Sequence, residues 1–195
     1  MRGPSEINFT RPENYPFKAQ NTIQEDDIVY TETVSYFHVN SSDRNTTSYP
    51  SVNNYRIVSD ETFKNIHSIE LVAASIANQG SPLNNPYLIL KIDGLDHLHF
   101  SNKNVNKGFA TMYLKSTTGA HVQPELGVLQ RNILIFKTPL ASLNNVDISI
   151  VSPNGTLFAF GEGAGDTTVA FSNSFLLKII TLEKSRKALH NRATF

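Results

Sequence analysis

The stretch that decides the fold is residues 65–92, which read NIHSIELVAASIANQGSPLNNPYLILKI. Apolar residues alternate along its first half, as in Ile69, Leu71 and Ala73. A second apolar run, Tyr87–Ile92, follows a break rich in Asn, Gly and Pro. This pattern predicts two long strands joined by a loop. Because an isolated strand pair is only marginally stable in water, other strands must cover the apolar face.

The rest of the chain supplies such strands, because short apolar runs alternate with turn residues. Besides Ile66–Ile76 and Tyr87–Ile92, the predicted strands are Ile28–Val39, Val52–Val58, Gly108–Leu114, Arg131–Lys137, Val146–Val151, Thr156–Phe160 and Ser174–Leu182. Asn-Gly in the segment 152–155 predicts a tight hairpin turn, and single helical turns are expected at 60–64 and 140–144. Strand 174–182 is apolar on both faces, which predicts a central position with one face in the core and the other covered by a neighbouring element or subunit.

These strands predict an all-β protein with a single eight-stranded jelly-roll sandwich and an extended N-terminal arm. An immunoglobulin-like sandwich is the alternative, but it packs about seven strands into roughly 100 residues, fewer than these strands occupy. We place the arm at 1–27, where the sequence is polar and contains three prolines. The jelly-roll domain is expected at 28–183 and a basic tail at 184–195.

Composition excludes several classes of protein. The chain has 195 residues, no cysteine, and 17 basic against 17 acidic side chains. A disulfide scaffold and a thiolate metal site are therefore excluded. The balanced charge gives no global field toward nucleic acid, and no apolar run approaches the roughly 18 residues of a membrane span. We expect a soluble protein without a secretory signal, without nucleic-acid binding and without direct membrane insertion.

Motifs for chemistry are weak. His97 and His99 fall on one side of an extended chain, as in the metal pair of cupin-type jelly rolls, but residues 100–104 supply no carboxylate as a further ligand. The glycine-rich segment 161–166 lacks the helix or the Lys-Ser/Thr pair of a phosphate-binding loop. There is no Gly-x-Ser-x-Gly nucleophile motif. We therefore predict no enzyme activity, no cofactor, and no catalytic or metal-ligating residues.

Three stretches in a fixed order carry a family resemblance. The first is FHVNSSDRN at 37–45, followed by Tyr49-Pro50 and by NYRI at 54–57; the second is IHSIELVAASIAN at 66–78, followed by NPYL at 85–88; the third is VDI at 146–148, NGTLF at 154–158 and SFLLKI at 174–179. In this order they resemble the single jelly-roll penton and minor capsid proteins of nucleocytoplasmic large DNA viruses, including algal viruses. Ala77 stands where that family usually has proline, and Asn40 where aspartate is common.

The resemblance implies a structural virion protein without catalysis. A short chain without large insertions favours the penton subunit, which closes the five-fold vertices of an icosahedral capsid. It would be made in the host cytoplasm, assemble as a homopentamer, and contact the major capsid protein and other minor capsid proteins at the capsid vertex. The alternatives are a minor capsid protein elsewhere in the shell or a carbohydrate-binding jelly-roll module, with a cupin-like enzyme as a further, weaker candidate.

The family-motif positions are expected to be structural or to lie at subunit interfaces. They are Asp43, Arg44, Tyr49, Pro50, Asn78, Asn85 and Gly155. For Asp43 and Arg44 two interpretations remain open. The pair either contacts a neighbouring subunit or orders the Ser-rich turn locally, with Asp43 capping backbone N–H groups.

Overall fold

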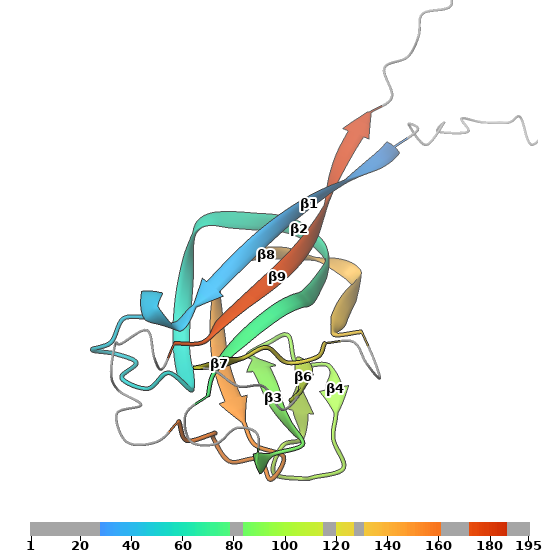
Figure 1. The fold of residues 1–195 in the computed structure, drawn as a ribbon. Coiled ribbons are helices and arrows are strands. Elements are labelled where there is room, and N and C mark those ends of the chain that lie inside the picture. The colour runs from blue at the N-terminus through green and yellow to red at the C-terminus, as the bar shows by residue number, and fades with distance from the viewer. Residues whose placement is uncertain (1–27, 79–83, 115–119, 127–130, 161–171, 187–195) are drawn as a thin grey trace, which may run out of the picture. The chain divides into compact units, whose positions relative to one another are not determined.

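A computed structural model describes most of the chain (Figure 1). The described residues are 28–78, 84–114, 120–126, 131–160 and 172–186. Contacts divide the chain into two compact units, Tyr30–Glu183 on the one hand and Met1–Val29 with Lys184–Phe195 on the other. In the second unit only strand residues 28–29 and 184–186 are described. The predicted arm, residues 1–27, lies outside the described residues, as does the predicted tail from residue 187 on.

Apart from turns and loops, the described chain is almost entirely β-strand. Its elements are β1 (Ile28–Asn40), the 3₁₀ turn η1 (Ser41–Asp43), β2 (Asn54–Ala77), β3 (Tyr87–Ile92), β4 (Leu98–His99), β5 (Lys107–Gly108), β6 (Ala110–Tyr113), β7 (His121–Val122), β8 (Ile133–Val151) and β9 (Ser174–Arg186). The all-β prediction is confirmed, and strand Tyr87–Ile92 has its predicted bounds. No helix among the described residues is long and apolar enough to span a membrane.

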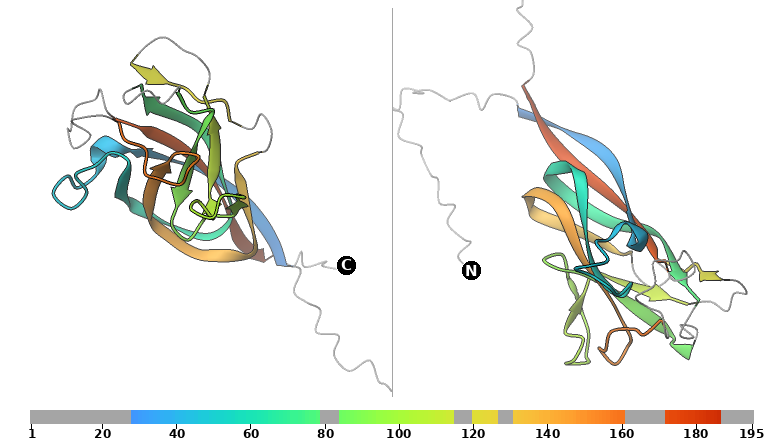
Figure 2. Two further views of the ribbon diagram at one scale, coloured as in Figure 1. Left: turned by 90° about the horizontal axis from the view of Figure 1, so that it is seen from below. Right: turned by 90° about the vertical axis from the view of Figure 1, so that its left-hand side faces the viewer.

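Two of the strands are longer than predicted. β2 joins the predicted strands Val52–Val58 and Ile66–Ile76, and β8 joins Arg131–Lys137 and Val146–Val151. The helical turns expected at 60–64 and 140–144 are therefore wrong, because these segments pair with each other through the bend that β2 and β8 share (Figure 2).

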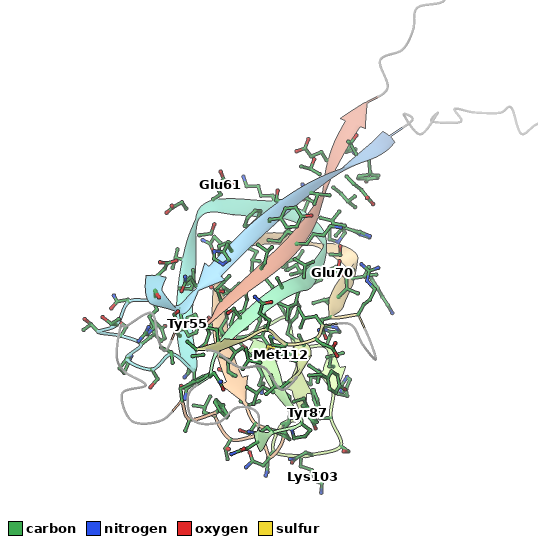
Figure 3. The ribbon with its side chains drawn as sticks, in the orientation of Figure 1. Tyr55, Glu61, Glu70, Tyr87, Lys103 and Met112 are labelled. Atoms are coloured by element: carbon green, nitrogen blue, oxygen red, sulfur yellow. The ribbon has the colours of Figure 1, made fainter. Side chains whose placement is uncertain are left out.

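The shared bend explains the misleading sequence pattern. Phe63 pairs with Leu143, and register shifts lie on both sides of this part of the ladder. Asn65 adopts a φ of 53°, a left-handed conformation that Asn tolerates better than most residues. Glu61 lies at the outer side of the bend (Figure 3) and is exposed, as are most of its neighbours. The apolar residues that this ladder presents to the core, Phe63, Leu140 and Leu143, are separated by exposed residues and by register shifts, so the segment shows no regular strand periodicity.

All strand pairs are antiparallel, and the large sheet has the order β1-β9-β2-β8-β3-β6, with β7 beside β2. The sheet curls because β2 and β8 each contribute to two parts of it. Residues 54–58 of β2 pair with 145–149 of β8, whereas residues 68–70 pair with 133–135. We call β1, β9 and the second half of β2 with the first half of β8 the β9 layer. The other halves of β2 and β8, with β3 and β6, form the β3 layer.

β9 lies between β1 and β2, as its apolar sequence predicted. Phe175, Leu177 and Ile179 are fully buried in the main hydrophobic core, which also contains residues of β2, β3, β6 and β8. Leu176 and Ile180 alternate with them and are only partly buried. One side of β9 therefore forms the core, and the other side faces outward.

Other predictions near the turns need correction. The predicted strand Thr156–Phe160 is wrong: it makes only an isolated bridge, between Val151 and Leu157. Its alternating pattern has another cause, because Phe158 and Phe160 pack edge to face in the core with ring centroids 4.7 Å apart.

The predicted strand Gly108–Leu114 is interrupted. Lys107–Gly108 pairs with β4, while Ala110–Tyr113 pairs with β3. The hairpin turn at 152–155 is confirmed, since the Gly155 N–H donates to the Ser152 carbonyl at 2.9 Å. Within this turn only Gly155 has a positive φ, of 89°.

Candidate functional site

The loop after β1 is held together by Arg44. Its guanidinium donates to three backbone carbonyls: those of Ser41 (2.8 Å), Tyr49 (2.9 Å) and Pro50 (2.9 Å). Arg44 is only 5% exposed, and this burial lowers its pKa. Because all three acceptors are carbonyls, the charge is stabilised by peptide dipoles. Arg44, Tyr49 and Pro50 are thus brought together as one closed loop.

Asp43 does not take part in this network. It is exposed in η1, and no ion pair joins it to Arg44 in the described part of the chain. The capping that we expected of Asp43 is carried out by Asn40, whose Oδ1 accepts from the Ser42 N–H at 2.9 Å. Asn45 acts in the same way, because its Oδ1 accepts from the N–H groups at positions 47 and 48. Asn40, Asn45 and Arg44 therefore order the turn locally, and Asp43 does not cap it.

A buried asparagine fixes this loop to the sheet. Asn173 is fully buried immediately before β9. Its Oδ1 accepts from the Ala77 N–H (2.9 Å), its Nδ2 donates to the Val52 carbonyl (3.2 Å), and its backbone N–H donates to Ser41 Oγ (2.8 Å). Removing this side chain would leave buried backbone groups unpaired, which is costly. Asn173 thereby joins η1 to β9 and to segments at both ends of β2.

Tyr55 lies on the inner side of β2 (Figure 3). Its hydroxyl is buried and has no hydrogen-bond partner among the described residues. Burial raises the pKa of Tyr55, and the charge of Arg44 partly opposes this shift. The phenol therefore stays neutral and is not poised for proton transfer near neutral pH.

The remaining motif residues lie elsewhere. At the end of β2, the backbone N–H of Asn78 donates to the Ala120 carbonyl at 2.7 Å, and Asn85 is partly buried shortly before β3. A Cβ on Gly155 would come within 2.7 Å of the Asn104 backbone carbon. The structure therefore gathers Arg44, Tyr49 and Pro50 in one loop beside Asp43, and it places Asn78, Asn85 and Gly155 in other turns and strand ends.

Two comparisons with known proteins bear on this chain. Residues 26–80 match the model of a family of unknown function (DUF5901). No curated protein matches the chain. The matched segment contains β1, the Arg44 loop and β2, which is less than half of the chain. The similarity therefore concerns this segment and assigns no activity.

The two histidines considered for metal binding are placed differently. The His97 ring packs edge to face on Phe109, with centroids 5.7 Å apart, and its Nε2 is buried without a partner in the described part. His99 is exposed in β4. Within the described ranges, no three His, Asp or Glu side chains lie close enough to hold a metal ion. The glycine-rich segment 161–166 lies outside the described residues.

A groove crosses the outer face of the β9 layer. One part has a volume of about 480 Å³ and an adjoining part about 320 Å³, and both are lined by Val72 and Leu126. Other lining residues come from β1 (His38), β9 (Ser174, Leu176), β2 (Glu70, Ala73, Ser75) and the segment after β7 (Gln123, Pro124). The groove is open and its lining is mixed, whereas small-molecule sites are mostly enclosed and apolar. It fits contact with another protein surface better than it fits catalysis.

Proposed function

We propose that this chain is a structural virion protein, the penton capsomer subunit that closes the five-fold vertices of the icosahedral capsid of a large DNA virus. The observation that carries the proposal is the double use of β2 and β8. If each is counted as two strands, the β9 layer has four strands and the β3 layer has four. With β7 left aside, this count of four strands in each layer supports an eight-stranded jelly roll.

The order of the strands supports this architecture. In the β9 layer the order is β1, β9, residues 66–77 of β2, and residues 133–140 of β8. In the β3 layer it is residues 54–58 of β2, 145–151 of β8, then β3 and β6. In the β9 layer the first and last strands are neighbours, and in both layers strands far apart in sequence pair with each other, as in two Greek keys.

The motif residues also favour a scaffold. Arg44 closes a loop, Gly155 sits at a crowded turn and Asn78 anchors a strand end, so each has a structural task. The stretches that resemble the penton and minor capsid proteins of large DNA viruses coincide with β1 and β2, the start of β3, the end of β8 and β9. The functional role then lies in contacts between proteins.

The proposed partners follow from the vertex position. Five copies would form a ring through head-to-tail contacts that close after five rotations. The ring would contact the major capsid protein and other minor capsid proteins. Residues 1–27 would serve as a tether, because an extended chain reaches about 3.3 Å per residue.

A particle reconstruction tests the proposal. The expected result is density for five copies of the Tyr30–Glu183 unit at each vertex. Density elsewhere in the shell would favour a minor capsid role, and absence of the chain from purified particles would contradict a virion function. Deletion of residues 1–27 should leave thermal unfolding unchanged and prevent incorporation at the vertex, with the full-length chain as the control.

A further inference from the structure

Large apolar side chains gather on the outer face of the β9 layer. On β1, Val34 is 48% and Tyr36 61% exposed, while the alternate residue Phe37 packs against the core. On β8, Ile135 is 60% exposed. Scattered exposed apolar residues are common, but a group of them on one sheet face marks an interaction surface.

The strand register shows that these residues share one face. Ile135 pairs with Ser68, and Ser68 pairs with Ile180, so the three side chains lie side by side across β8, β2 and β9. His38 of β1 lines the same groove as Leu176 of β9. Because alternate residues of a strand share a face, Val34 and Tyr36 lie on the same side as His38. The apolar surface therefore spans all four strands of the layer.

The charges on this face are distributed unevenly. In its middle, Glu70 accepts a hydrogen bond from Arg131 at 2.7 Å and pairs across the strands with Lys178. Toward the edges, alternation places Glu32 on the outer face of β1 and Lys137 on the outer face of β8. On this face the β1 edge thus carries one acidic residue and the β8 edge one basic residue.

We infer that this face packs against a second copy of the chain, with the β1 edge of one copy over the β8 edge of the other. Such a contact brings Glu32 of one copy toward Lys137 of the other, and unlike charges at a rim favour this register. The charges of the middle are already compensated within each copy, and the chain has no net charge to oppose self-association. The inference goes beyond the proposed function, because it assigns a self-association surface. Like faces that pack on each other close as a pair, so this contact is separate from the head-to-tail contacts of the ring.

A charge placed in the face tests the contact. Ile135→Glu introduces a carboxylate at an exposed position, so the monomer should fold. Val58→Glu is the matched control, because Val58 is 67% exposed on residues 54–58 of β2, in the other layer. Sedimentation velocity over a dilution series of the full chain measures association. Wild type and Val58→Glu should self-associate alike, and Ile135→Glu should weaken association about tenfold or more.

A wild-type chain that stays monomeric at every concentration would overturn the inference, as would equal effects of the two variants. A charge swap gives a second test that does not depend on apolar contacts. Glu32→Lys and Lys137→Glu should each weaken association several-fold, and the double variant should restore it. Failure of the double variant to restore association would exclude the proposed register.

The two proposals fail separately. Particle reconstruction tests the position at the vertex, whereas sedimentation of the isolated chain tests the surface. If the protein is found at the vertex but Ile135→Glu leaves its self-association unchanged, the proposed function stands and the proposed interface is excluded.

Discussion

The outer faces of the two layers differ in how they are covered. On the β3 layer, Ile89 points outward but is fully buried in a cluster with Val105 of the following loop and with Val151, its partner on β8, and Phe100 and Tyr87 pack against this cluster. Elsewhere on that face Val58 is exposed, without other large apolar residues of β2 beside it. On the β9 layer, Ile135 points outward and remains 60% exposed. The chain thus covers one sheet face with its own loop and leaves the other apolar face open. Since burial of apolar area is the main driving force of association, the open face is the one available to a partner.

Two isoleucines give the sharpest test of this comparison. Ile89→Ala should lower the free energy of unfolding by about 2–5 kcal/mol, because it leaves a cavity under the covering loop. Ile135→Ala should change it by less than about 0.5 kcal/mol in the monomer, since its side chain is already largely in water. Chemical denaturation at low protein concentration measures both. Equal losses would mean that the two faces are covered to the same degree.

Glycines test how the covering loop is held. Gly155 and Gly94 both have positive φ, of 89° and 75°, but only Gly155 is crowded, by Asn104 of the covering loop. Gly94→Ala should cost about 1 kcal/mol for its backbone conformation. Gly155→Ala should cost about 1–3 kcal/mol more, because the Asn104 backbone must move.

Hydrogen exchange locates this second effect. Gly155→Ala should speed exchange of the Val105 amide, while Gly94→Ala should leave that exchange unchanged. If the two alanine variants lost the same stability, the turn would not be what holds the loop in place.

The difference between the faces was only partly visible in the sequence. Strand 87–92 could be predicted because its apolar run is bounded by turn residues. The two apolar sides of 174–182 could also be predicted. What periodicity could not show is the single ladder through 59–65 and 140–145, because most residues of both segments are exposed and register shifts interrupt the alternation where the sheet bends. The pattern at 156–160 predicted a strand, because Phe158 and Phe160 are both buried and their spacing is the same as that of the buried residues of a strand.

The polar network was less predictable still. Arg44 and Tyr49 stood out through a motif, and the loop between them is short enough for local reasoning. Asn173 did not stand out, because its partners Ser41, Val52 and Ala77 are distant in sequence and a single Asn before a strand has no distinctive pattern. Asn132 is similar: its buried amide bonds both backbone groups of Thr111. Such residues become evident only once the fold brings the strands together.

Surface ion pairs allow the same comparison of the two layers, with smaller expected effects on stability. Arg131–Glu70 lies on the open face. Arg56–Asp147 lies on the β3 layer, where Nε and Nη2 of the arginine each donate to the carboxylate at 2.7 Å. Arg131→Gln should cost the monomer at most about 1 kcal/mol, because Arg131 is exposed. In the assembled state its cost should rise, since a second copy would bury the unpaired Glu70.

Arg56→Gln is the matched control for this pair. It should have a small effect that added salt removes, and assembly should not enlarge it. Association constants from sedimentation, combined with unfolding midpoints, separate the two contributions. An Arg131 variant that weakens assembly no more than its Arg56 counterpart would argue that the ion pair lies outside the contact.

The smallest expected effect is a pH dependence at the end of β3. Asp96 Oδ1 accepts from the Ile92 N–H at 3.0 Å, and burial raises the pKa of this carboxyl, while that hydrogen bond and Lys91 partly lower it. Because the pKa in the folded chain is above its unfolded value of about 4, the folded state binds the proton more tightly, and stability falls as pH rises through this interval. Asp96→Asn keeps an acceptor oxygen without the charge, so it should raise the unfolding temperature slightly at neutral pH. The gain should shrink on acidification and disappear below the unfolded pKa.

Asp93→Asn, at an exposed neighbour, is the control for general charge effects. A gain in unfolding temperature for Asp96→Asn that stayed constant with pH would show that ionisation of Asp96 is not its cause.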